Sequence, residues 1–177
     1  DKELIFKWIN HRVLFRQRWG YKRGKQDAAK FLKYEEDVVE PTYQTLKAEL
    51  LDKNIFEPIA IYAYYPCISW DNKIYIFDKK YLFNSLEEAK NVPPLSEAIK
   101  VLEFPRQKRK PFRCIADFFA NDRLDVIAFT LASAGLKISD YERSLYDKGE
   151  FTKYYQVHGL GVELAEALAE VLHKQIR

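Results

Sequence analysis

The final quarter of the chain contains the pattern that most limits its fold. Leucines recur there at every fourth residue, which is the spacing of one face of an α-helix. The pattern predicts one long helix over about 152–177 with a buried stripe of Leu160, Leu164, Leu168 and Leu172. A second stripe of small residues leaves room for another backbone or a flat ligand, and consists of Gly161, Ala165 and Ala169.

The polar residues of this helix fall on its opposite side. We expect a solvent-exposed face there, made of Glu163, Glu166, Glu170 and Lys174. Glu170 and Lys174 have the spacing of a favourable i,i+4 ion pair. No glycine or other stop signal ends the helix at Arg177, so we expect the natural chain to continue beyond it.

Helical patterns also occupy the beginning of the chain. They predict helices over 1–15 and 26–52, and Pro41 is expected to open the second part of the latter. A further helix is predicted from Ser139, whose capping box includes Glu142, to about Lys148. Gly149 is expected to end it.

The middle of the chain is rich in β-forming residues. It predicts five strands, over 58–67, 73–78, 101–104, 111–119 and 125–135. The first two are expected to form an antiparallel hairpin through a turn at 69–73, and 80–99 to be a surface excursion with a helix start at Asn84-Ser85. We therefore predict one α+β domain over 1–177, with a helical part over about 1–55 and the sheet and C-terminal helices over about 56–177.

One carboxylate lies inside an apolar run. Pro111–Phe119 has the composition of a strand buried on both faces, and Asp117 lies within it. A buried carboxylate costs several kcal/mol unless it is paired or hydrogen-bonded. Two interpretations of Asp117 stay open: a structural residue bonded to backbone N–H groups, or a residue that binds a ligand.

The composition is that of a globular domain. The chain is 47% hydrophobic and 31% charged, and its net charge of +3 favours a polyanionic partner only weakly. The sequence contains no run of about 18 apolar residues, so no membrane span is expected. Cys67 and Cys114 have no cysteine or histidine neighbours at zinc-binding spacing, which indicates two buried free thiols in a cytoplasmic protein.

Motifs of the common catalytic classes are missing from the sequence. It has no glycine-rich phosphate loop and no GxSxG elbow, and its three histidines have no partner at metal-binding spacing. We therefore expect no metal site and no self-contained catalytic set of residues.

Arginines and aromatic residues alternate over Arg12–Lys25. Such a stretch can bind nucleic acid, with cations on the phosphates and rings stacked on the bases. The alternative, favoured because no wider basic surface accompanies it, is that the rings pack inward while the arginines stay in water.

Five short runs occur in the order in which one family has them. The runs are Leu14–Trp19, Tyr64–Cys67, Phe104–Gln107, Cys114–Phe118 and His158–Glu170. Together they resemble the activation domain of cobalamin-dependent methionine synthase, over nearly all of the chain.

The resemblance implies a twisted antiparallel sheet flanked by helices and a role in repair of the cofactor. In this family S-adenosylmethionine supplies a methyl group and a flavodoxin-type protein supplies an electron, which together convert cob(II)alamin to methylcobalamin. The cobalamin is held by a separate domain, so the expected partners are that domain and the electron donor, with neither nucleic acid nor membrane.

The resemblance also implies a ligand site. Asp117 and Glu166 match family positions that contact S-adenosylmethionine, and a carboxylate suits the amino group, the sulfonium or the ribose hydroxyls of that ligand. The family's other binding segment, Arg-x-Ser-x-Gly-Tyr-Pro-Ala-Cys-Pro, follows the last helix. It is not within residues 1–177, so half of the site is expected to lie outside them.

Two other functions stay open at this point. One is a nucleic-acid-binding domain that uses Arg12–Lys25. The other is a docking module without its own ligand, whose basic turn Lys108-Arg109-Lys110 would suit an acidic partner.

Overall fold

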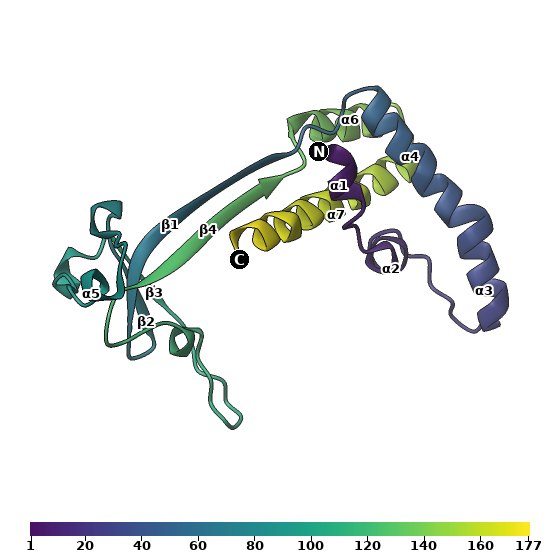
Figure 1. Ribbon diagram of the computed structural model, residues 1–177. Helices are drawn as coiled ribbons and strands as arrows, with labels where there is room; N and C mark the ends of the chain where they lie inside the picture. The colour runs from purple at the N-terminus through teal and green to yellow at the C-terminus, as the bar shows by residue number, and fades with distance from the viewer. The chain divides into compact units, whose positions relative to one another are not determined.

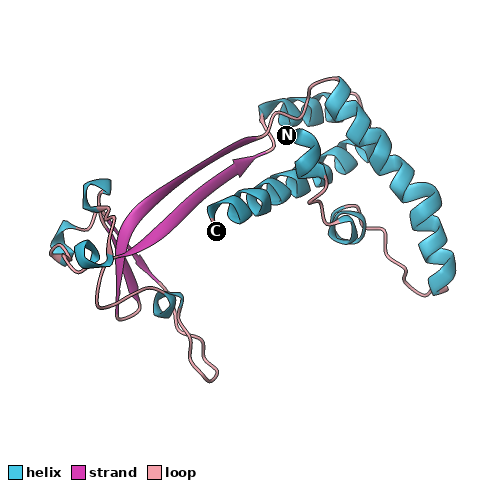
Figure 2. Cartoon of the chain, in the orientation of Figure 1, coloured by secondary structure: helices cyan, strands magenta, loops and turns pink.

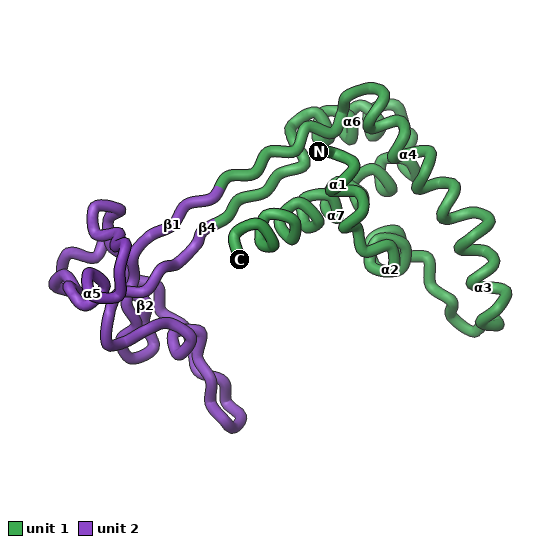
Figure 3. Tube along the Cα trace, in the orientation of Figure 1, with its two compact units in different colours: residues 1–61, 130–177 green, residues 62–129 purple.

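The computed structural model describes residues 1–177. The chain divides into two compact units (Figure 3): a first unit of residues 1–61 and 130–177, and a second unit of residues 62–129. The single domain expected from the sequence stays a prediction.

The strands form one open antiparallel sheet in the order β3-β2-β1-β4 (Figures 1 and 2). Their bounds are Ile59–Trp70 for β1, Lys73–Ile76 for β2, Lys100–Glu103 for β3 and Asp125–Ser133 for β4. Cys67 of β1 lies opposite Ile76 of β2, which confirms the predicted hairpin. The turn is shorter than predicted and consists of Asp71 and Asn72, because β1 extends to Trp70.

The first unit contains the helices of both ends of the chain. They are α1 (Lys2–Phe6), α2 (His11–Val13), the π-helical turn η1 (Leu14–Arg18), α3 (Ala28–Tyr34), the π-helical turn η2 (Glu35–Val39), α4 (Glu40–Asp52), α6 (Leu136–Asp147) and α7 (Phe151–Ile176). The long C-terminal helix is confirmed, and all four leucines of its predicted stripe are buried. Gly161 of the small-residue stripe admits a neighbouring helix, because a Cβ there would lie 3.0 Å from the Ile138 side chain of α6.

Two helix boundaries in this unit differ from the prediction. The predicted helix over 1–15 is broken, because Asn10 caps α2 by accepting a hydrogen bond from the backbone N–H of Val13 at 3.1 Å. Helix α6 begins at Leu136 rather than after Ser139, since Gly135 makes the sharp turn into it with φ +99°. Its end is as predicted, with Gly149 in the left-handed region.

The second unit contains β2, β3 and short helical turns. These are η3 (Lys79–Tyr81), α5 (Leu86–Ala89), η4 (Leu95–Glu97) and η5 (Ile115–Phe118). The helix start at Ser85 is confirmed, because its hydroxyl accepts a hydrogen bond from the backbone N–H of Glu88. The predicted strand over 111–119 is wrong: residues 115–118 form η5 and none of the segment joins the sheet, which has four strands rather than five.

Both cysteines are buried free thiols, as predicted. Burial raises the pKa of Cys67 to about 12, so its thiol stays protonated at neutral pH. Cys114 lies at the N-cap of η5 rather than in a strand. None of the helices combines the length and apolar character that crossing a bilayer requires.

A carboxylate joins three helices of the first unit. Glu49 of α4 accepts hydrogen bonds from Lys53 at 2.6 Å, from the Tyr141 hydroxyl of α6 at 2.6 Å and from Lys153 of α7 at 3.0 Å. Burial acts to raise the pKa of Glu49, but these hydrogen bonds outweigh it and lower the pKa to about 2. The native state therefore favours the ionised carboxylate.

This depressed pKa predicts a pH-dependent contribution to stability. The contribution is fully present above the ordinary glutamate pKa of about 4.3 and is lost as pH falls towards about 2. Because water screens part of the interaction, we expect Glu49→Gln to lower the free energy of unfolding by about 1–2 kcal/mol at pH 7. Urea unfolding at a series of pH values checks this: the difference between the two proteins should shrink between pH 5 and pH 2.5, and a constant difference would contradict it.

Candidate functional site

The two residues expected to contact a ligand lie in different units. Asp117 is in η5 of the second unit, and Glu166 is in α7 of the first. Each is therefore considered with the neighbours that its own unit provides.

Asp117 is fully engaged by protein groups. Arg106 donates two hydrogen bonds to it, Nη1 to Oδ2 at 2.8 Å and Nη2 to Oδ1 at 2.6 Å. The backbone N–H of Cys114 donates a third, to Oδ2 at 2.8 Å. The pKa of Asp117 is lowered by these bonds, above all by those from Arg106, so the carboxylate is ionised at neutral pH.

The predicted burial of Asp117 is wrong. Its side chain is 37% exposed, while Cys114 and Ala116 beside it are buried. The physical reason is the tight turn of η5, which points these two small residues into the core and turns the charge outward. The bond from the Cys114 N–H matches the structural interpretation of Asp117. The ion pair adds a second structural role, because it holds Arg106, which follows β3, against η5.

A cavity of about 500 Å³ opens beside this ion pair. Its lining combines charged, polar and aromatic side chains: Ser69, Trp70, Asp71, Arg106, Asp117, Phe119 and Asn121. Trp70 is 62% exposed, so its ring is available for stacking. The cavity can accommodate a small polar molecule that carries a flat group.

Glu166 is more open to solvent than Asp117. Its side chain is 58% exposed, and Oε1 accepts a hydrogen bond from Nη2 of Arg18 at 2.5 Å. Its Oε2 has no hydrogen-bond partner within the protein. Glu166 therefore lies on the solvent face, as predicted, with one oxygen available for a ligand.

Glu163, which we also predicted to face solvent, is buried at 3% exposure. Nε of Arg18 donates to its Oε1 at 2.8 Å, so one guanidinium joins the buried and the exposed carboxylate. The arginine reaches this position because Gly159 has no side chain: a Cβ there would lie 3.0 Å from Cβ of Arg18 and 2.9 Å from the Trp19 ring. Lys174, predicted to pair with Glu170, instead has its Nζ 5.0 Å from the centre of the Trp8 ring.

Much of the basic-aromatic stretch faces the interior of the first unit. Phe15 and Trp19 are buried at 6% exposure, and the Trp19 indole N–H donates to the Gln156 carbonyl at 2.8 Å. Arg16 makes a two-pronged ion pair with Glu35. The inward packing of the rings is confirmed, while two of the arginines, expected to be free in water, are held by carboxylates.

Sequence reasoning missed Arg18, Glu163 and Arg106 as structural partners. Arg106 precedes Asp117 by only 11 residues. This short spacing, with a turn expected between the two residues, is a signal from which the pair could have been predicted. Arg18 and Glu163 are 145 residues apart, and no local pattern joins them. No three His, Cys, Asp or Glu side chains within 1–177 are grouped as metal ligands would be.

The fold is similar to that of a solved protein described as the MetH reactivation domain bound to AdoHcy. The match has a TM-score of 0.72 and 22% identity, and covers 100% of this chain and 53% of that chain. This similarity shows that the chain has the same α+β fold as that domain.

The sequence comparisons identify the family. Residues 5–177 match the family model for the activation domain of vitamin B12-dependent methionine synthase, and the chain belongs to this family. It is 32% identical to methionine synthase of Mycobacterium tuberculosis and 33% identical to that of Mycobacterium leprae, with 96% of the chain covered in each case. The chain spans 14% of the length of each of these relatives.

Proposed function

We propose that this chain binds S-adenosylmethionine and supports the reductive methylation of cob(II)alamin in methionine synthase. Its family membership over 5–177 is the observation that carries the proposal. The structural relative is described as binding AdoHcy, the product that S-adenosylmethionine leaves when it gives up its methyl group.

The cobalamin and the electron belong to partners in this proposal. A cobalamin-binding domain holds the corrinoid, and a flavodoxin-type donor supplies the electron. The cofactors supply the reactive groups, and the chain's own part is to bind and orient the methyl donor. The free thiols of Cys67 and Cys114 support a cytoplasmic location, since disulfides are rare there.

Asp117 and Glu166 are the candidate contacts, and their geometry ranks them. Glu166 comes first because it has an open carboxylate oxygen, which can accept a hydrogen bond from the ligand's ammonium group or from a ribose hydroxyl. Asp117 can reach a ligand in the adjacent cavity only if it gives up a bond to Arg106 or shares an oxygen.

Calorimetric titration with S-adenosylmethionine tests this proposal, on residues 1–177 and on the protein at its natural length. We expect Glu166→Gln to weaken binding by about tenfold or more, because a charge-assisted hydrogen bond becomes a neutral one. Glu170→Gln is the matched control, since it removes the same charge from an exposed position on the same helix. Absence of binding by both wild-type proteins would refute the function, and equal affinities of the two variants would refute the role of Glu166.

The role of Asp117 needs a second pair of variants. If Asp117 contacts the ligand, Asp117→Asn weakens binding while Arg106→Gln, which frees the carboxylate, does not. Equal losses in both variants would show that the ion pair acts only by holding the loop.

A further inference from the structure

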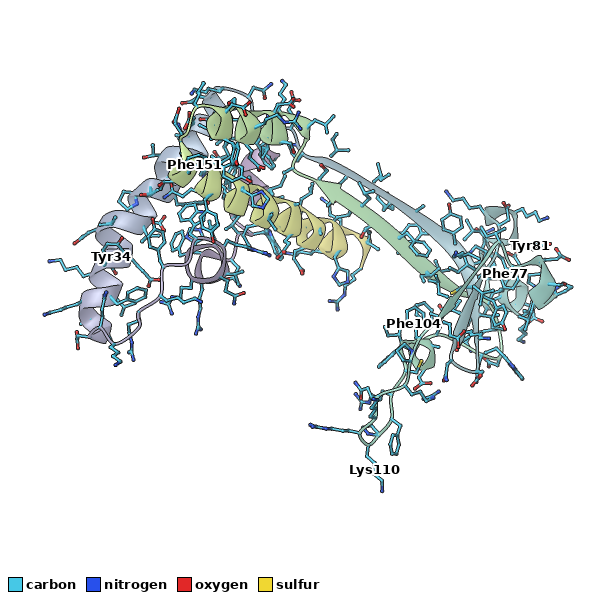
Figure 4. The ribbon with its side chains drawn as sticks, turned by 180° about the vertical axis from the view of Figure 1, so that it is seen from behind. Tyr34, Phe77, Tyr81, Phe104, Lys110 and Phe151 are labelled. Atoms are coloured by element: carbon cyan, nitrogen blue, oxygen red, sulfur yellow. The ribbon has the colours of Figure 1, made fainter.

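A loop in the second unit concentrates positive charge, and apart from Arg106 the proposed function does not use it. Residues 106–113, here called the basic loop, connect β3 to η5 and contain Arg106, Lys108, Arg109, Lys110 and Arg113. All five side chains are exposed, and only Arg106 has a carboxylate within ion-pair distance. Figure 4 shows Lys110 at the end of the loop, with its side chain pointing away from the sheet.

Hydrogen bonds hold the basic loop in one shape. The backbone N–H of Gln107 donates to the Arg113 carbonyl at 2.9 Å, and that of Phe112 donates to the Arg109 carbonyl at 2.8 Å. Arg106 adds a bond to the Phe112 carbonyl at 2.9 Å while it pairs with Asp117. A loop that is already ordered loses little conformational entropy when it binds a partner.

Apolar side chains lie exposed in and next to these cations. Phe112 is 47% exposed, Ile115 is 54% exposed and Phe118 is 73% exposed. Aromatic residues and arginine together are enriched in protein–protein interfaces. The combination of exposed cations and exposed apolar side chains therefore favours a protein partner over small anions from solution.

The charge around the basic loop narrows the class of partner. Outside the loop, residues 62–129 contain nine Asp and Glu against six Lys and Arg, and Asp71 and Asp117 line the same cavity as Arg106. A nucleic-acid strand or an anionic bilayer carries negative charge over a wide area, whereas the excess positive charge of this unit lies in the basic loop alone. A folded partner can place a few acidic side chains opposite the loop alone. We propose that the basic loop is a docking element for an acidic polypeptide surface.

Fluorescence anisotropy with a labelled polyglutamate peptide tests this inference at low and physiological salt. The variant has Lys108→Gln, Arg109→Gln and Lys110→Gln, and should bind the peptide about tenfold more weakly or worse at low salt. The matched control has Lys30→Gln, Lys33→Gln and Lys148→Gln, three exposed cations of the first unit with no ion-pair partner. It makes the same change in net charge and should bind as the wild type does.

Several results would overturn the inference. They are no binding of the peptide by the wild type, equal losses in the two triple variants, or tighter binding of single-stranded DNA or of phosphatidylserine vesicles than of the peptide. Thermal unfolding of both variants verifies that they fold. None of the probes is S-adenosylmethionine, so the outcome is independent of the test of the proposed function.

Discussion

Replacing Gly135 with alanine should cost about 3 kcal/mol or more of stability. A Cβ at this position would lie 2.4 Å from the carbonyl oxygen of Glu57, which is backbone and cannot turn away. The approach is fixed by a hydrogen bond from the Glu57 N–H to the Ala134 carbonyl at 3.3 Å. Gly135 also has φ +99°, which alanine adopts only with strain.

Thermal unfolding followed by circular dichroism measures this effect. For a chain of this length the loss corresponds to a fall in Tm of about 6–12 °C. Gly149→Ala is the matched control: its φ is +76°, but no atom lies within 4 Å of the added Cβ. It should cost only about 1–2 kcal/mol, from backbone strain alone. Equal losses in the two variants would show that the contact with Glu57 is unimportant.

Arg18→Ala should destabilise the first unit by about 2–3 kcal/mol. The substitution leaves Glu163, at 3% exposure, as a buried carboxylate without its cation. Arg18 itself is 34% exposed, so water replaces part of the lost interaction and the cost falls below that of a fully buried pair. Urea unfolding at pH 7 measures the change.

A second substitution separates the buried charge from lost packing. Glu163→Gln in the Arg18→Ala background should recover at least about 1 kcal/mol, because it removes the unpaired charge. Arg123→Ala serves as the control, since Arg123 and Asp122 are both exposed, and should change stability by less than about 0.5 kcal/mol. If the double variant recovers nothing, the cost comes from packing of the Arg18 side chain.

The family motifs were readable from the sequence, but the exposure of Asp117 and its ion pair with Arg106 were not. The apolar run around it looked like a buried strand because Cys114, Ile115, Ala116 and Phe118 are all apolar. In the fold, Ile115 and Phe118 are exposed and the run is a 3-10 turn. The turn leaves Asp117 exposed, and two hydrogen bonds from Arg106 compensate its charge.

The sequence by itself determined the elements whose signals repeat along the chain. The leucine spacing predicted α7, and the β-forming runs around a polar turn predicted the β1–β2 hairpin, because a periodic pattern reports which face of an element is buried. The tertiary structure alone decided which charges are buried. Glu163 and Glu166 belong to the same polar pattern, yet Glu163 is buried and Glu166 is exposed, and Arg18, far away in the sequence, pairs with both from its position against Gly159 of α7. The free energy of a charge depends on neighbours that folding brings from distant segments, and a local pattern does not contain them.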